Sequence, residues 1–239
     1  MLQPDCGLST PASHDTSPVR KKRTRVVAGA LADPTLELHN SAGSLIVSND
    51  NWKDTQQAAI METGLAPPND FEPARLRSLA PGDYTAILRG KNNTTGVGLV
   101  EVYDIDQSDA STVTNISTRG FVDVGSAVMI GGFIVGGAGN ASLPMLVRAL
   151  GPTLTQFGVS SVQADPTLEL HDATGTVIGF NDNWQDTQKA QIQASGLAPP
   201  NPVESAIIIT RPPSNTTAIV RGKNNTTGNA LVELYTLTP

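Results

Sequence analysis

Short runs of alternating apolar and polar residues recur along the second half of the chain and predict β-strands. Leu168 and Leu170 fall on one face of such a run, while Glu169 and His171 fall on the other. Gly, Pro, Asn or Asp separates most runs. The pattern predicts an all-β fold of two jelly-roll-like antiparallel sandwiches in tandem. The expected strands of the second sandwich span 115–122, 128–135, 144–150, 166–171, 176–180, 206–210, 217–221 and 231–237.

One short surface helix is expected in each half of the chain, over residues 54–63 and 186–195. Asp54 and Asp186 are suited to cap the helix N-termini, because a short carboxylate accepts hydrogen bonds from first-turn amides. Gly64 and Gly196 suit the left-handed position that follows a helix, and the prolines after them prevent continuation. Each helix is expected to cross from one sheet to the other.

The two halves are copies of one repeat. Residues 32–104 align without a gap with residues 164–236 and are identical at 43 of 73 positions. The segment 115–162, with three strand-like runs, precedes the second copy only. We therefore expect a polar tail over 1–24, a first sandwich over 25–108 that lacks its opening strands, and a complete second sandwich over 109–239. Either the chain is a fragment of a longer repeat array, or another segment completes the first sandwich.

Composition narrows the functional classes. The net charge is −6, and the basic run 20–25 lies at the end of the tail, so the remainder of the chain is acidic and a nucleic-acid partner is not expected. Cys6 is the single cysteine, which excludes an intrachain disulfide and a multi-cysteine zinc site. No apolar run is long enough to span a membrane, and no signal peptide is recognisable, so the start is expected to be truncated.

The most polar motif shared by the two copies is Asn-Asp-Asn-Trp-x-Asp. Its oxygens suggest a calcium site, because calcium prefers several carboxylate and carbonyl ligands. The alternative is a strand-to-helix turn whose Asx side chains bind backbone amides, while Trp52 or Trp184 covers the core edge. Both interpretations stay open, and calcium is the only cofactor considered. The candidate ligands are Asn49, Asp50, Asn51, Asp54, Asn181, Asp182, Asn183 and Asp186.

A second shared motif, Gly-Lys-Asn-Asn-Thr-Thr-Gly, is expected to form an exposed hairpin loop between the last two strands. Its polar side chains suit a sugar or a protein partner, but Asn and Gly also tolerate positive φ, and Thr hydroxyls bind local amides. Its glycine spacing is not that of a phosphate-binding loop. The candidate binding residues are Lys91, Asn92, Asn93, Thr94, Lys223, Asn224, Asn225 and Thr226.

Catalysis is not expected. His39 and His171 occupy equivalent strand ends, without a Ser or Cys nucleophile fixed beside them, so a structural hydrogen-bonding role is favoured. Glu37 and Glu101, with their counterparts Glu169 and Glu233, are considered as facing carboxylate pairs. The chain has few aromatic residues to stack against a sugar in a glycosidase cleft. Arg148 is expected to pair across the sheets or to lie at an exposed edge.

These motifs resemble a known family. Residues 168–183 look like the first half of a bacterial pre-peptidase C-terminal domain, and residues 81–90 with 98–103 look like the second half. The resemblance implies a secreted, non-catalytic jelly-roll sandwich. The fuller pattern is similar to a tandem module of very large secreted bacterial proteins, carried by residues 116–121, 130–133, 148–152, 164–171 and 181–184.

The expected function is a non-catalytic extracellular or cell-surface module, structural or adhesive, in a larger secreted protein or assembly. The alternative is a calcium-dependent carbohydrate- or matrix-binding module. A protein or carbohydrate partner is expected at the surface loops. Strand addition or self-association is expected at the open sheet edge of the first repeat, because an unpaired edge templates further strands.

Overall fold

The computed structural model describes residues 27–105, 115–135 and 142–237. The chain divides into two compact units, residues 1–105 and 106–239. The boundary expected between residues 108 and 109, and the expected tail over 1–24, lie outside the described residues. Each unit is described by itself below.

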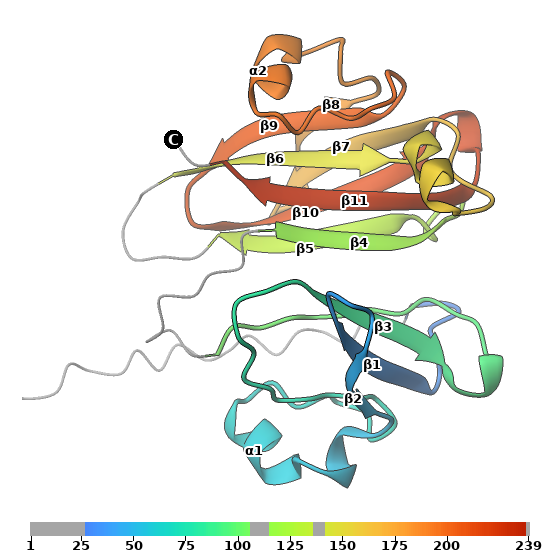
Figure 1. Ribbon diagram of the computed structural model, residues 1–239, viewed down its shortest axis with the longest axis vertical. Coiled ribbons are helices and arrows are strands. Elements are labelled where there is room, and N and C mark those ends of the chain that lie inside the picture. The colour runs from blue at the N-terminus through green and yellow to red at the C-terminus, as the bar shows by residue number, and fades with distance from the viewer. Residues whose placement is uncertain (1–26, 106–114, 136–141, 238–239) are drawn as a thin grey trace, which may run out of the picture. The chain divides into compact units, whose positions relative to one another are not determined.

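The second unit is the complete β-sandwich that the alternation predicts (Figure 1). One antiparallel sheet has the order β5-β10-β7-β8 and the other the order β4-β11-β6-β9. Consecutive strands mostly belong to different sheets, so the chain passes back and forth between the two layers. The strands are β4 (Asn115–Val122), β5 (Met129–Val135), β6 (Leu143–Leu150), β7 (Pro166–Asp172), β8 (Val177–Asn181), β9 (Ser205–Arg211), β10 (Ser214–Gly222) and β11 (Gly228–Thr236).

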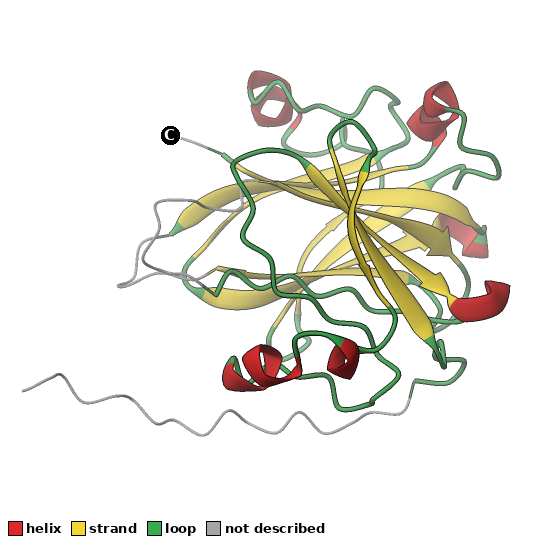
Figure 2. Ribbon diagram, turned by 60° about the horizontal axis from the view of Figure 1, so that its bottom comes forward, coloured by secondary structure: helices red, strands yellow, loops and turns green. Residues whose placement is uncertain are grey.

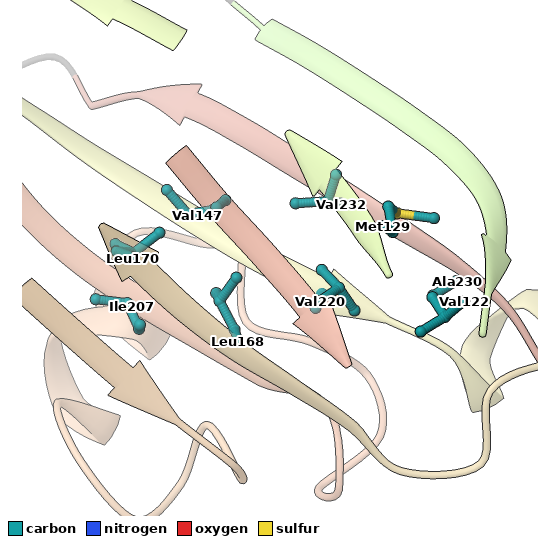
Figure 3. Packing of buried hydrophobic residues seen from close by; sticks show 11 residues of the cluster. Val122, Met129, Val147, Leu168, Leu170, Ile207, Val220, Ala230 and Val232 are labelled. Atoms are coloured by element: carbon teal, nitrogen blue, oxygen red, sulfur yellow. The ribbon is translucent and has the colours of Figure 1, made fainter. Parts of the chain in front are cut away.

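The core of the second unit lies between its two sheets (Figure 3). Leu168 and Leu170 have no exposed surface, as their alternation with Glu169 and His171 predicts. Burial of each leucine contributes about 1.5–3 kcal/mol. A second apolar cluster covers the other face of β6 and includes Trp184 and Ile192. Strand β6 is therefore buried on both faces, which explains its nearly continuous apolar sequence.

The first unit forms only part of this sandwich. Its one sheet, in the order β2-β1-β3, corresponds to β8-β7-β10 of the second unit. Residues 73–79 and 96–104, which align with β9 and β11, form no regular strand here. The opening strands would lie before residue 27, where the described part of this unit begins, so the expectation that the first sandwich lacks them stays a prediction. The strands are β1 (Pro34–Asn40), β2 (Leu45–Asn49) and β3 (Tyr84–Gly90).

The helices are shorter than predicted and begin later (Figure 2). They are α1 (Gln57–Glu62) and α2 (Lys189–Ala194), and η1 (Trp52–Asp54) is a separate 3₁₀ turn. The prediction that Asp54 caps a helix is wrong, because the N-cap is Gln56 and the Asp54 carboxylate accepts a hydrogen bond from the Asn51 side chain instead. Gly64 and Gly196 follow the helices with φ of 71° and 73°, as predicted. No helix in the described ranges is long and apolar enough to cross a membrane.

Candidate functional site

In each repeat a lysine joins the two candidate motifs. Lys91 Nζ lies 2.6 Å from Asp50 Oδ2 and 3.6 Å from Asp33 Oδ2. Lys223 makes the same contacts in the second repeat, at 2.6 Å to Asp182 and 3.5 Å to Asp165. The hydrogen bond to Asp50 is the main reason why the pKa of Lys91 is raised. The acidic bend and the asparagine loop are thus one ion-paired cluster in each unit.

A buried asparagine fixes the bend that leads into each cluster. Asn181 is 3% exposed, and its Oδ1 accepts a hydrogen bond from the Ala206 amide at 3.0 Å. Its Nδ2 donates to the carbonyl of Asn183 at 3.0 Å. Asn49 makes the matching contacts with Ala74 and Asn51. These asparagine oxygens are committed to backbone amides, as the turn interpretation predicts.

Most of the oxygen atoms expected to bind calcium are therefore engaged in other contacts. Asp50 Oδ2 accepts from Lys91, and Asp54 Oδ2 accepts from Asn51. Buried Oδ1 atoms of Asp33, Asp50 and Asn51 have no hydrogen-bond partner among the described residues. No group of three or more His, Cys, Asp or Glu side chains in the described ranges is arranged to hold a metal. The residues fit a cluster neutralised by lysine, and a calcium ion would have to displace Lys91 Nζ.

The asparagine loop is held at its base by hydrogen bonds and is exposed at its tip. Asn92 and Asn93 adopt φ of 55° and 61°, and Asn224 and Asn225 adopt 56° and 59°. The Thr94 hydroxyl donates to the carbonyl of Lys91 at 2.9 Å. The prediction of a hairpin is wrong, because β10 and β11 belong to different sheets and the loop crosses between them. The left-handed conformation of two consecutive asparagines makes this crossing turn. Residues 92–95 and 224–227 are exposed.

The histidines are held by acceptors on both ring nitrogens. His171 Nδ1 lies 3.0 Å from the Gly175 carbonyl, and Nε2 lies 3.1 Å from Glu169 Oε2. His39 repeats both contacts with Gly43 and Glu37. The Gly175 carbonyl and then Glu169 raise the pKa of His171. Because both nitrogens face acceptors, the doubly protonated ring is favoured, and such a ring has no lone pair with which to act as a general base.

A shallow depression of about 420 Å³ lies beside His39 in the first unit and is lined also by Ser41 and Asp83. Ser41 and Thr85 bring hydroxyl groups to the depression, and the two ring nitrogens of His39 face Gly43 and Glu37. The depression thus places a hydroxyl near an imidazole without making a nucleophile–base pair.

The carboxylates expected to face each other do not. Glu169 lies beside His171 on one sheet, whereas Glu233 lies on the other sheet, where Arg148 Nε is 2.6 Å from its Oε2. The expectation that Arg148 pairs across the sheets is wrong, because Arg148 and Glu233 are direct neighbours on adjacent strands. Arg148 also donates to the Leu197 carbonyl and to the Tyr235 hydroxyl. These polar side chains around Arg148 lie on the face of the sheet that the second apolar cluster covers, and they have a structural role.

No family model matches the chain, and no curated protein matches it. Among solved structures it is similar to the pre-peptidase C-terminal domain of a collagenase from Bacillus anthracis. The two are 12% identical with a TM-score of 0.32, over 51% of this chain and 89% of that chain. A likeness at this level assigns neither a family nor an activity.

Two further pairs of residues position the site, and the sequence analysis missed them. Gln188 Nε2 donates to the Ile208 carbonyl at 2.8 Å, and the Ile208 amide donates to its Oε1 at 3.0 Å. Glu204 is fully buried and accepts from the amides of Gly151 and Thr153. The sequence held a partial signal, because both residues are identical in the two repeats, as Gln56 and Glu72, and the immediate neighbours of Glu72 differ between them.

Proposed function

We propose that this chain is a non-catalytic extracellular module of structural or adhesive function within a larger secreted or surface protein. The observation that carries the proposal is that both repeats use their reactive side chains in the same way. Lys91 and Lys223 neutralise aspartates, and His39 and His171 have both ring nitrogens engaged. Two copies of one ion-paired scaffold suit mechanical or adhesive work, where duplication adds avidity, better than they suit a reaction centre.

The exposed Asn-Asn-Thr-Thr tips are the proposed adhesive elements. They are identical in sequence in the two repeats and exposed in both. The lysine–aspartate cluster fixes the base of each loop, so little conformational entropy is lost when the tip binds. Their amide and hydroxyl groups donate and accept hydrogen bonds, which is the chemistry of carbohydrate recognition.

The test is retention of the full chain on a panel of immobilised polysaccharides and on denatured collagen. Matched variants replace Asn92 and Asn93 by Gly, Asn224 and Asn225 by Gly, or all four. Glycine keeps the left-handed backbone and removes the side chains. We expect each double substitution to weaken retention and the fourfold substitution to abolish it, as avidity requires. Retention that is equal in all variants, or absent on every surface, would overturn the adhesive function; release of soluble products would overturn the non-catalytic assignment.

The second candidate is a calcium-dependent carbohydrate- or matrix-binding module, favoured by the three buried oxygens without a hydrogen bond near Lys91. A bound ion must raise the melting temperature by mass action. Calcium titration of the wild-type chain and of Lys91→Met decides it. A rise that is larger in Lys91→Met supports the calcium site, since the variant removes the competing cation. No rise in either protein removes the metal from consideration.

A further inference from the structure

In the first unit no described residue takes the place of one strand of the complete sandwich, although the segments that align with both neighbours of that strand are present. In the second unit β6 lies between β11 and β9 and pairs with both. The first unit has the aligned segments 96–104 and 73–79, and neither forms a strand. Residues 11–18 stand at the offset of β6, but they read Pro-Ala-Ser-His-Asp-Thr-Ser-Pro. This sequence has no apolar alternation, has a proline at each end and has Thr16 where β6 has Arg148.

Among the described residues of the first unit, none covers the face that β6 covers in the second unit. Val232 is 5% exposed, whereas the aligned Val100 is 42% exposed and the neighbouring Val102 is 76% exposed. Leu168 and Leu170 are fully buried, whereas the aligned Leu36 and Leu38 are only half-buried. The first unit therefore keeps an apolar face whose cover is not among the described residues. We call this face, formed by Leu36, Leu38, Leu88 and residues 99–103, the acceptor face.

The polar partners of Arg148 are also retained. In the second unit Arg148 binds Glu233, the Tyr235 hydroxyl and the Leu197 carbonyl. The first unit has Glu101, Tyr103 and Leu65 at the aligned positions. The Tyr103 hydroxyl hydrogen-bonds to Glu101, as Tyr235 does to Glu233. An arginine on an incoming strand would lie beside the same three groups and would share Glu101 with the contacts that it already makes, because a carboxylate accepts several hydrogen bonds at once.

The turn that follows β6 has its own receptor. Glu204 accepts from the amides of Gly151 and Thr153 and from the Thr153 hydroxyl, and a fourth hydrogen bond comes from the Asn201 amide. The aligned Glu72 keeps the hydrogen bond from the Asn69 amide at 3.3 Å and is only half-buried. The carboxylate that holds a Gly-Pro-Thr turn is therefore present in the first unit as well.

We infer that the first unit binds, from another repeat unit of this kind, an unpaired apolar strand with the chemistry of β6 and its turn. The incoming strand pairs with residues 99–104, its arginine lies level with Glu101 and Tyr103, and its Gly-Pro-Thr turn binds Glu72. The β6 strand of a second copy is not the source, since Leu146 and Val147 are buried within its own sandwich. This partner completes the fold of the first unit, and the inference does not depend on what the asparagine loops bind.

One side of the acceptor face differs between the repeats. Arg75 and Arg77 stand where β9 has the inward-facing Ile207 and Ile209. Strand β9 is an edge strand, so long arginine side chains in this position can extend past the edge of the sheet into water. The incoming strand is therefore expected to pair first with residues 99–104, and the 73–79 side is expected to add less to its affinity.

The test mixes the full chain with a synthetic peptide of residues 142–157 and measures binding together with amide hydrogen exchange. We expect saturable binding, with slower exchange at residues 99–104 and no change in the second unit. The Arg148→Met peptide should bind at least tenfold more weakly. The Glu101→Gln chain should lose the same factor in affinity for the wild-type peptide. It should bind the Arg148→Met peptide little more weakly than the wild-type chain does, because the two substitutions remove the same contact. Equal binding of both peptides, no protection at 99–104, or protection confined to the second unit would overturn the inference.

A covalent version removes any dependence on peptide solubility. Residues 115–157 are placed directly ahead of Val26, which reproduces the spacing between the opening segment and the repeat in the second unit. We expect residues 99–104 to become as protected as residues 231–236, and expect Arg148→Met in the added segment to reverse part of that protection. An added segment that leaves exchange at 99–104 unchanged would overturn the inference.

Discussion

Arg148 on β6 and Glu233 on β11 are paired residues of adjacent strands, and 2.6 Å separates Nε from Oε2. Their side chains are 15% and 8% exposed, so water screens the pair poorly. Ser117 and the Tyr235 hydroxyl both donate to Glu233 Oε1, which satisfies the rest of the carboxylate. This network ties β4, β11 and β6 together on one face of the sheet.

Removing one member of this pair is expected to destabilise the second unit strongly. Arg148→Met keeps the length of the side chain but leaves the Glu233 carboxylate buried without its counter-charge, which costs about 3–5 kcal/mol. Urea unfolding followed by Trp184 fluorescence, in a Trp52→Phe background, reports this unit because the chain has two tryptophans. Lys189→Met is the control, since its lysine makes an exposed contact with Gln185; a loss as large there would refute the argument from burial.

The strands of the second unit could be predicted because their chemistry is local. Alternation at Leu168 and Leu170 requires only that one face be buried, and Gly or Pro marks the turns. The partner of Arg148 could not be predicted, because it depends on which strands are neighbours. The sequence contains no local signal that β11 lies between β4 and β6. Without that order, nothing in the sequence distinguishes Glu233 from Glu169 as the partner of Arg148.

Gln188 ties α2 to β9 through two hydrogen bonds with the backbone of Ile208. Gln188→Asn is expected to lose both, because asparagine is one methylene too short, while it still tolerates the left-handed φ of 53°. At about 0.5–1.5 kcal/mol for each bond, the second unit should lose about 1–3 kcal/mol. Amide exchange of Ile208, an edge-strand residue, should accelerate selectively.

Gln193→Asn is the matched control for this prediction, because Gln193 is exposed on the same helix. It makes the same chemical change without removing a contact to β9, and asparagine lowers helix propensity by less than about 1 kcal/mol. If both variants lower the stability equally, and Ile208 exchanges at the wild-type rate, then the clamp contributes nothing.

The sequence predicts the residues of the candidate site but not the contacts that join them. The Asn-Asp-Asn and Lys-Asn-Asn motifs were recognised separately, yet the structure joins them through Lys91 and Asp50. Forty-one positions separate these two residues, and only the fold brings them together. The helix start was misplaced for a related reason: Asp54 has a closer partner in Asn51 than any helix amide. A capping signal cannot show that a neighbouring side chain binds the carboxylate first.

Stability should depend on pH through His171, in a direction fixed by its contacts. The Gly175 carbonyl and Glu169 raise its pKa in the folded protein above the ordinary value of 6.5. The folded state therefore holds the proton more tightly, and this stabilisation is fully present below pH 6.5 and is lost as the pH rises through the folded pKa. The difference in unfolding free energy between wild type and His171→Asn should be largest near pH 5 and should shrink above pH 6.5. Glu169→Gln should narrow that window because it removes one cause of the shift. Urea unfolding at several pH values measures it, and a difference that grows with pH would show that His171 is held as the neutral ring.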